Sequence, residues 1–265
     1  MKKERVDVLC VEQGLFDSRE KAKRGIMAGL VHDEHDRLDK PGTKIPSDTK
    51  LYIKGKKMPY VSRGGLKLEK AIDYFHLDLN HLTMLDIGSS TGGFCDCALQ
   101  HGASYIYAVD VGTNQLNWKI RSDERVCVKE NTNFRYASSD MFDKVIDFAS
   151  IDVSFISLKH IFPPLSEIIK DQGIIVALIK PQFEARKEQV GKHGIIKDQT
   201  VHKEVIEKVI EYGRLNHIYI QDLTYSPITG GEGNIEFLGL FKNNGHLIDI
   251  DVDSLIEEAH HHFKG

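Results

Sequence analysis

The chain has 265 residues, of which 41% are hydrophobic and 28% charged, and its formal net charge is -4. This composition excludes collagen-like, disordered and coiled-coil proteins, and the length allows one large domain with or without a small one. No apolar run approaches the roughly 20 residues of a membrane helix, the first five residues lead into charged sequence with no apolar export signal, and four cysteines are too few for a disulfide scaffold. We therefore expect a protein of the reducing cytoplasm.

The charge is unevenly distributed along the chain. Residues 1–60 carry 14 Lys and Arg against 10 Asp and Glu, and the remainder carries a net charge of -8. A basic segment on an acidic body suggests that the segment meets a polyanion. Chance unevenness over a short segment is the alternative.

The first 54 residues are predicted to form two short helices and some strands. Apolar residues from Val6 onward recur at helical spacing up to Gly14, which can end the first helix. Ser18 is a suitable N-cap for a second helix, which Gly29 would end. The polar side of the second helix carries four cations and should present a broad basic surface: Arg19, Lys21, Lys23 and Arg24.

This N-terminal segment resembles a known RNA-binding domain. With strands expected at residues 30–31 and 51–53, the string from Ser18 to Val31 is similar to the small domain first seen in ribosomal protein S-four, and the resemblance covers roughly residues 5–54. It implies that the basic helix, with Arg5, binds structured RNA. The acidic tip at residues 31–36 departs from the usual Val-Asn-Gly turn, and a solvated basic helix without a ligand is the alternative.

A short linker is expected after this domain. Residues 55–61 are polar, break both hydrophobic periodicities and contain Gly55 and Pro59. We predict a small α+β domain at residues 1–54, this linker, and a large domain at residues 62–265.

The large domain alternates strands and helices. Ser62 is expected to cap a helix, and a second helical pattern covers residues 201–212. Such alternation predicts an α/β domain with a mostly parallel sheet covered on both faces, and the last two strands would pair antiparallel at its edge. This is the shape of the Rossmann-like methyltransferase fold, which has seven strands. The strands predicted from the pattern are residues 83–87, 105–109, 145–153, 173–179, 217–225 and 236–241.

The strongest chemical signal is a Gly-rich turn directly after the strand at residues 83–87. Glycine lets the backbone pass close to a ligand at the carboxyl end of a strand. A nicotinamide fingerprint would have glycine at position 90, where this chain has serine. Acids two residues before the first glycine and at the end of the next strand are instead typical of sites for S-adenosylmethionine (SAM); a tight turn that binds nothing is the alternative. The predicted cofactor contacts are Asp86, Gly88, Ser89, Ser90, Thr91, Gly92, Gly93, Phe94, Asp110 and Val111.

The order Asp-x-Gly-x-Ser-Thr-Gly-Gly-Phe from Asp86 to Phe94 is a more specific pattern than a Gly-rich turn flanked by acids. It resembles the FtsJ-like RNA ribose methyltransferases, and within them the TlyA family, whose members join an S-four-type head to such a domain. This resemblance covers nearly the whole chain. It implies SAM-dependent methylation of cytidine 2'-hydroxyls in ribosomal RNA (rRNA) or ribosomal subunits. It also implies a catalytic Lys-Asp-Lys-Glu tetrad, which the matching segments place at Lys67, Asp152, Lys180 and Glu236, with Arg63 as a further RNA contact.

Residue chemistry supports two tetrad members independently. Asp152 and Lys180 each follow an apolar strand, at the edge where doubly wound sheets bind ligands, and packing alone does not place a charge there. A charge that faces water is the alternative. Lys67 could merely extend its stem along its helix, and Glu236 could be an ordinary strand-start acid. Our hypothesis makes Lys180 the base, Asp152 its orienting group, and the other two positioning groups.

Other chemistries fit the sequence less well. Methylation of base amines uses Asn/Asp-Pro-Pro-Tyr where this chain has residues 152–155, and methylation at pyrimidine carbon-5 needs a cysteine in that region. Cys95 and Cys97 follow the Gly-rich turn, where they should pack, and they have no second pair of metal ligands at suitable spacing. No metal site is predicted.

Two further segments have more than one interpretation, and the sequence also allows two other functions. Residues 184–200 could close over RNA or form an ordinary solvated loop, and the histidines at residues 260–262 are expected on a solvated terminal helix. A membrane-active haemolysin would need an amphipathic or spanning segment, which we do not find. A non-catalytic RNA-binding ribosome assembly factor would not need the tetrad. The sequence predicts no oligomeric state.

Overall fold

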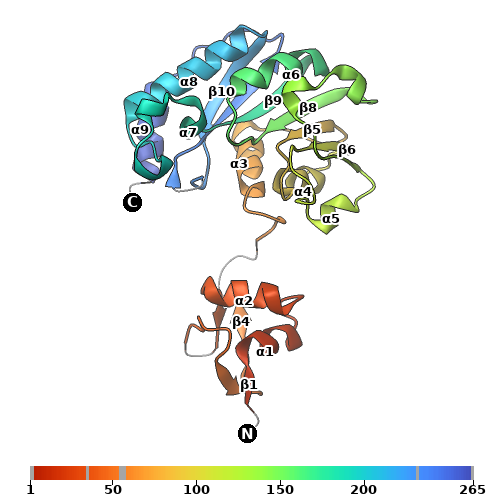
Figure 1. The fold of residues 1–265 in the computed structure, drawn as a ribbon, viewed down its shortest axis with the longest axis vertical. Coiled ribbons are helices and arrows are strands. Elements are labelled where there is room, and N and C mark those ends of the chain that lie inside the picture. The colour runs from red at the N-terminus through yellow and green to blue at the C-terminus, as the bar shows by residue number, and fades with distance from the viewer. Residues whose placement is uncertain (1–2, 34–35, 54–57, 231–232, 264–265) are drawn as a thin grey trace. The chain divides into compact units, whose positions relative to one another are not determined.

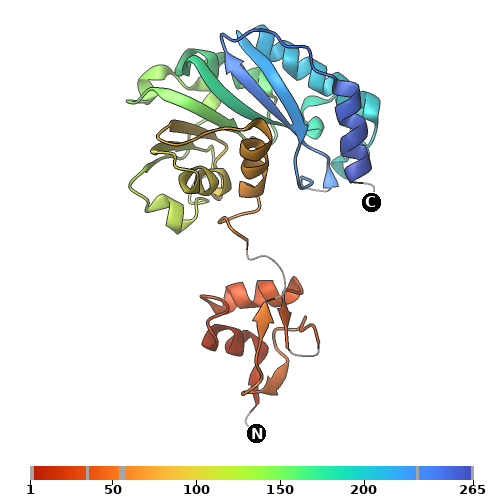
Figure 2. The same ribbon diagram turned by 180° about the vertical axis from the view of Figure 1, so that it is seen from behind.

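The structure is a computed structural model that describes residues 3–33, 36–53, 58–230 and 233–263 (Figures 1 and 2). The chain divides into two compact units, residues 1–59 and 60–265. Residues 55–57 of the expected linker, and Glu34 and His35 of the expected acidic tip, lie outside the described residues. None of the helices in the described ranges is both long enough and apolar enough to cross a membrane.

The N-terminal unit has a small core of its own. As predicted, Ser18 caps the second helix, because its Oγ accepts a hydrogen bond from the Lys21 backbone N–H at 3.3 Å. The unit also has two antiparallel strand pairs, β1 with β3 and β2 with β4. The pair β1–β3 was not predicted, since its strands are only three residues long. The elements are β1 (Lys3–Arg5), α1 (Val6–Glu12), α2 (Arg19–Met27), β2 (Val31–His32), β3 (Lys44–Pro46) and β4 (Tyr52–Ile53).

The second unit is built on a twisted sheet, in which seven strands lie within the described residues in the order β10-β11-β9-β8-β5-β6-β7. Only β11 runs against its neighbours, so the sheet is mostly parallel, as predicted. The predicted antiparallel pair of the last two strands is confirmed, with β11 inside the sheet and β10 at its edge. The strands are β5 (Thr83–Ile87), β6 (Tyr105–Val109), β7 (Val126–Lys129), β8 (Ile146–Ile151), β9 (Ile169–Ile179), β10 (Ile218–Tyr225) and β11 (Phe237–Asn243).

Helices cover both faces of this sheet (Figures 1 and 2). The strands are apolar on both sides: Met84 packs into the core beneath α3 and α4, whereas Leu85 and Ile87 pack into the core beneath α6, α8 and α9. This burial on both faces explains why the strands read as nearly continuous apolar runs. The helices are α3 (Gly65–Phe75), α4 (Gly93–Gln100), α5 (Trp118–Arg121), α6 (Phe162–Ile168), α7 (Pro181–Glu184), α8 (Gln199–Arg214) and α9 (Val252–His262). Short 3-10 helices lie in the connections at Phe134–Tyr136, Ser139–Met141, Leu158–His160, Lys187–Gln189 and Lys192–Gly194.

Two local predictions were wrong. Ser62 does not cap α3, which begins at Gly65 after Gly64 with no side-chain cap. His260 is not solvated: it is buried, and its Nε2 lies 2.9 Å from Nδ1 of His202 on α8. Burial lowers the pKa of His202 to about 4, so this imidazole is neutral at pH 7 where it meets His260 and joins α8 to α9.

Candidate active site

The sheet brings the predicted site residues to one edge. β5, β6, β8 and β9 are parallel, so the residues that follow them, including Asp110, Asp152 and Lys180, meet at their carboxyl ends. β11 is antiparallel to β9, and Phe237 pairs with Ile179. The start of β11, with Glu236 just before it, therefore reaches the same edge.

The four tetrad residues form one connected cluster. Lys180 Nζ lies 2.5 Å from Asp152 Oδ1, and Lys67 Nζ lies 3.7 Å from Asp152 Oδ2. Lys67 Nζ also donates a hydrogen bond to Glu236 Oε2 at 2.7 Å, and Lys180 Nζ donates to Ser154 Oγ at 3.2 Å. Residues separated by up to 169 positions in sequence thus make direct contact.

The cluster is charged and nearly buried. Lys67, Lys180 and Glu236 are 7%, 8% and 2% exposed, and the Asp152 side chain is 19% exposed. Two cations and two carboxylates balance one another, which is the condition under which charges are tolerated at such depth. Asp152 contacts both lysines, so it fixes the position of one amine relative to the other.

The Gly-rich turn approaches Asp152 from β5. Gly88 has a φ of 86°, and a Cβ at this position would lie 2.5 Å from the Asp152 backbone oxygen. The turn is also tied to Asp110: the Ser90 backbone N–H donates to Asp110 Oδ2 at 2.8 Å, and the Gly112 N–H donates to Oδ1 at 2.7 Å. The absence of a side chain at position 88 lets the end of β8 pass directly beside the turn.

Two cavities open on either side of this turn, with volumes of about 590 and 530 Å³. We call the larger the first cavity and the smaller the second. Both are lined by Gly88, Ser90, Asp152, Ser154 and Phe155. The first cavity also contains Arg63, Lys67, Ser89, Thr91, Gly93, Phe94, Lys180 and Glu236, and the second contains Asp110, Val111 and Thr132.

Asp86 does not lie where we predicted a cofactor contact. It is inside β5, not at its end, and its alternation with Leu85 and Ile87 turns it toward α4. There it is fully buried, accepts hydrogen bonds from Ser150 Oγ at 2.7 Å and Cys95 Sγ at 3.0 Å, and lines neither cavity. Gly92 also lines neither cavity; it is the residue before α4, with a φ of 91°.

Burial of Asp86 predicts a pH-dependent stability. Burial raises its pKa to about 6, above the roughly 3.9 of an unfolded chain. The folded state therefore binds this proton more tightly than the unfolded chain does. The stability that protonated Asp86 contributes is fully present below about pH 3.9 and is lost as the pH rises through about 6. Asparagine does not titrate, so Asp86→Asn should not lose this stability. The free energy of unfolding of the variant minus that of the wild type should therefore increase by roughly 2–3 kcal/mol between pH 4 and pH 8. Urea unfolding of both proteins across this range measures the difference; parallel curves would contradict it.

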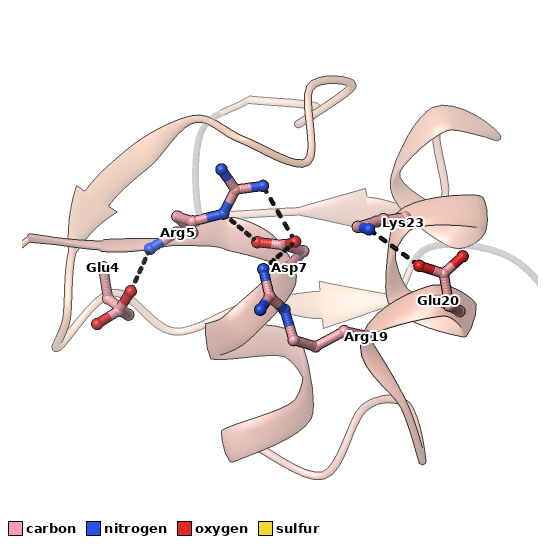
Figure 3. A network of polar contacts seen from close by, with 6 residues as sticks. All are labelled: Glu4, Arg5, Asp7, Arg19, Glu20 and Lys23. Carbon is pink, nitrogen blue, oxygen red and sulfur yellow. Dashed lines mark hydrogen bonds and ion pairs between the residues drawn. The ribbon is translucent and has the colours of Figure 1, made fainter.

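Four of the five predicted RNA contacts in the N-terminal unit pair with acidic side chains, and Figure 3 shows three of them: Arg5, Arg19 and Lys23. Arg5 and Arg19 both bind the buried carboxylate of Asp7, at 2.8 and 3.0 Å. Lys23 pairs with Glu20. The Arg5 guanidinium beside Asp7 lowers the pKa of that carboxyl, so the pairs persist at neutral pH. Of the other predicted contacts, Lys21 pairs with Asp17, Arg24 lies in the last turn of α2, and Arg63, in the second unit, is exposed and lines the first cavity.

Several residues at the site were not predicted from the sequence. Phe155 has a φ of 61°, is 92% exposed and lines both cavities. Its ring centroid lies 5.0 Å from that of Phe183, which follows Lys180 in α7. Gln182 and Asn234 also line the first cavity, and Gln182 Nε2 donates to Glu236 Oε1 at 3.4 Å. Each lies two or three residues from a predicted residue, but its sequence position alone does not show that it reaches the cavity.

The side chains that commonly bind metal ions are not clustered in the described ranges. In the part of the chain that the structure describes, no three His, Cys, Asp or Glu side chains are grouped so that they could hold an ion. Cys95 and Cys97 are buried in α4, and burial raises the pKa of the Cys97 thiol to about 12.

Fold and site together define a class. A sheet of this order, with a Gly-rich turn after the central strand β5 and a Lys-Asp-Lys-Glu cluster beside it, is that of a Rossmann-like methyltransferase. A model of the FtsJ-like methyltransferase family matches residues 60–243. The chain therefore belongs to the FtsJ-like methyltransferase family, which confirms the resemblance seen in the sequence.

Full-length relatives narrow the family further. The chain is 53% identical over 270 residues to YqxC of Bacillus subtilis, covering 99% of this chain and 96% of that protein. It is 36% identical over 234 residues to the 16S/23S rRNA (cytidine-2'-O)-methyltransferase TlyA of Mycobacterium tuberculosis, covering 88% and 87%. A solved structure named "Putative hemolysin from Streptococcus thermophilus" is 50% identical, with a TM-score of 0.79 and coverage of 100% and 98%. Within the FtsJ-like family, the chain is thus a member of the group that contains TlyA.

Proposed function

We propose that this protein transfers a methyl group from SAM to the 2'-hydroxyl of a cytidine in rRNA, acting on rRNA or ribosomal subunits in the cytoplasm. The observation that carries the proposal is the contact of Lys180 with Asp152 at 2.5 Å, in a cavity that shares its wall with the Gly-rich turn. The TlyA relative, which is named for this reaction, covers most of the chain.

The second cavity and the turn have the donors and acceptors that SAM needs. Each Asp110 oxygen accepts one backbone N–H and keeps capacity for a further donor, as the two ribose hydroxyls of an adenosine require. The bare backbone at Gly88 permits close approach to the cofactor at the shared wall of the cavities. SAM supplies a methyl group on a sulfonium, which is a good leaving group, so no metal is needed to activate it.

The tetrad then supplies positioning and proton transfer. Lys180 first releases a proton to water, and its neutral amine then accepts the 2'-hydroxyl proton while the ribose oxygen bonds to the methyl carbon and the carbon–sulfur bond breaks. Asp152 holds this amine, and Lys67, held by Glu236, fixes Asp152 from its other side. The products are a 2'-O-methylated ribose, S-adenosylhomocysteine and a protonated Lys180. Holding the reacting atoms in line supplies most of the acceleration.

The N-terminal unit is proposed to bind structured RNA through α2 and Arg5. The pairs of Lys21 and Lys23 are exposed, and such surface pairs contribute little to stability, so phosphate can replace the carboxylates at small cost. Arg63, at the first cavity, would contact RNA close to the reacting nucleotide.

Methyl transfer to purified ribosomal subunits tests the proposed function. Small and large subunits from a strain that lacks this protein are incubated with the full-length chain and methyl-labelled SAM, and ribose methylation is mapped by resistance to alkaline cleavage. We expect label at cytidine 2'-oxygens. Binding of RNA and SAM without any transfer in a single turnover would instead support a non-catalytic assembly factor, and leakage of liposomes caused by the pure protein would support a lytic role.

Phe155 gives a prediction about the substrate base. An aromatic ring this exposed, at the wall shared by the two cavities, is placed to stack on an RNA base, and such stacking contributes roughly 1–3 kcal/mol per base. We expect Phe155→Ala to lower kcat/KM for subunits by roughly 10- to 100-fold and to leave SAM affinity within about twofold. Tyr74→Ala is the control, since Tyr74 is an exposed aromatic on α3 that lines neither cavity. Equal activity of the two variants would exclude the stacking role.

A further inference from the structure

We propose that Asn234 is a positioning residue that holds residues 190–196, here called the cavity loop, as a wall of the first cavity against which the RNA nucleotide is placed. This inference rests on the proposed function, because it takes the RNA strand as the occupant of that cavity. Asn234 lies two residues before Glu236 and has no part in the mechanism above.

The cavity loop forms one side of the first cavity. Val190, His193 and Gly194 line it together with the tetrad residues Lys180 and Glu236. His193 and Gly194 have φ values of 62° and 74°, so the loop turns sharply where it meets the cavity. Exposed Lys187 and Lys197 lie in sequence on either side of the loop and suit a polyanionic occupant.

Asn234 is what fixes this turn to the rest of the site. Its Oδ1 accepts the backbone N–H of Ile196 at 2.9 Å, and its Nδ2 donates to the backbone oxygen of Gly194 at 2.9 Å. Its own backbone oxygen accepts the Gly230 N–H at 2.9 Å. One buried amide, 2% exposed, therefore joins the cavity loop to the segment that carries Glu236.

The bonds determine the conformation of the loop in a way that packing alone does not. Ile196 is buried and anchors one end of the loop, but His193 is exposed and Gly194 is only half-buried. Without the amide, the cavity loop would lose both of its hydrogen bonds to Asn234, one at Gly194 and one at Ile196. Ordering the loop again when RNA binds would then cost free energy, so KM for RNA should rise. SAM affinity should not change, because the adenosine part of SAM is assigned to the second cavity.

The test compares Asn234→Leu with Asn243→Leu in the full-length chain. Asn243, at the other end of β11, is also a buried amide whose Nδ2 donates to backbone oxygens, those of Ser166, Ile169 and Lys170. Both variants therefore lose a buried amide, one just before β11 and one at its end, but only Asn234→Leu loses the hydrogen bonds to the cavity loop. Asn234→Asp is the second variant: it keeps an acceptor for Ile196 and loses the donor to Gly194.

Two measurements are made at a temperature where the proteins are folded. In Asn234→Leu we expect hydrogen exchange of the Ile196 amide to accelerate about tenfold or more. KM for ribosomal subunits should rise about tenfold or more, with SAM affinity within about twofold of wild type. Asn234→Asp should fall between this variant and the wild type, and Asn243→Leu should match the wild type in both measurements.

Three results would overturn the proposal: an unchanged Ile196 exchange rate, an unchanged KM, or an equal rise of KM in Asn243→Leu. If Asn234→Leu does not fold, Asn234→Asp decides by the same measurements. If the wild type transfers no methyl group to any subunit, the proposed function fails instead, and the exchange rate of Ile196 still decides whether Asn234 holds the loop.

Discussion

Replacing Lys180 by methionine is expected to reduce methyl transfer by roughly 10²–10⁴-fold, the usual contribution of a positioned base. Methionine has nearly the length of the lysine stem but cannot accept the proton of the ribose hydroxyl. Asp152 keeps its contact with Lys67 at 3.7 Å, so the substitution does not leave an isolated buried carboxylate. SAM affinity should stay within about twofold, because Asp110 and Gly88 are untouched. Single-turnover rates with labelled SAM and calorimetric SAM binding measure the two effects.

A matched pair at the other end of the same strands provides the control. Lys170, in β9, binds Asp147, in β8, with Nζ 2.6 Å from Oδ1. This pair repeats the chemistry of Lys180 and Asp152 on the same two strands, but it is more exposed and lies at the amino end of the parallel sheet. Lys170→Met should therefore leave the rate unchanged. Wild-type rates in Lys180→Met would show that Lys180 is not the base.

Most of the fold was predictable because the sheet is buried on both faces. Strands β5 and β6 were predicted to the residue, since each is a short apolar run that ends at a Gly or Asp turn. β7 was missed: its four residues are only half-buried, at the edge of the sheet, and they carry no such run. The cap of α3 was predicted wrongly because Ser62 lies against Gly93, and a Cβ there would come 2.3 Å from its Oγ. Sequence alone does not show this tertiary contact.

The site was predictable to the extent that strand ends determine it. Asp152 and Lys180 follow apolar strands, and parallel strands bring such positions together. Asp86 was placed wrongly because the motif gives its spacing from the glycines but not the face of the strand on which it lies. Asn234 could not be predicted, because its two partners lie near position 195 and nothing in the sequence relates the two segments.

The ion pairs of the N-terminal unit could not be predicted from the sequence. The spacing of cations along α2 was visible in the sequence. The sequence also gives the number of acids in this unit, but not which cations those acids contact. Asp7, from another helix, binds both Arg5 and Arg19 (Figure 3). The charge available to RNA is therefore smaller than the count of lysines and arginines implies, and Arg24 and Arg63 carry more of the proposed contact.

Gly88→Ala is the second substitution with a large expected effect, and it acts through the backbone. A methyl group at Gly88 would lie 2.5 Å from the Asp152 oxygen and 2.9 Å from its carbonyl carbon, distances that no rotamer can relieve. Either the turn or the end of β8 must move, and Asp152 moves with it. A displacement near 1 Å at a reacting centre costs about a hundredfold in rate, so we expect methyl transfer to fall about 10²-fold or more, together with weaker SAM binding.

The left-handed conformation must be separated from the steric clash. Gly14 has a φ of 69°, and a Cβ there would meet no atom within 4 Å. Gly14→Ala therefore carries the conformational cost alone, about 1–2 kcal/mol of stability, and should keep the wild-type rate. Thermal melts, SAM titrations and single-turnover rates of the two variants distinguish the cases. If Gly88→Ala loses no more activity than Gly14→Ala, the turn does not set the position of Asp152, and the cofactor does not depend on the bare backbone at this residue.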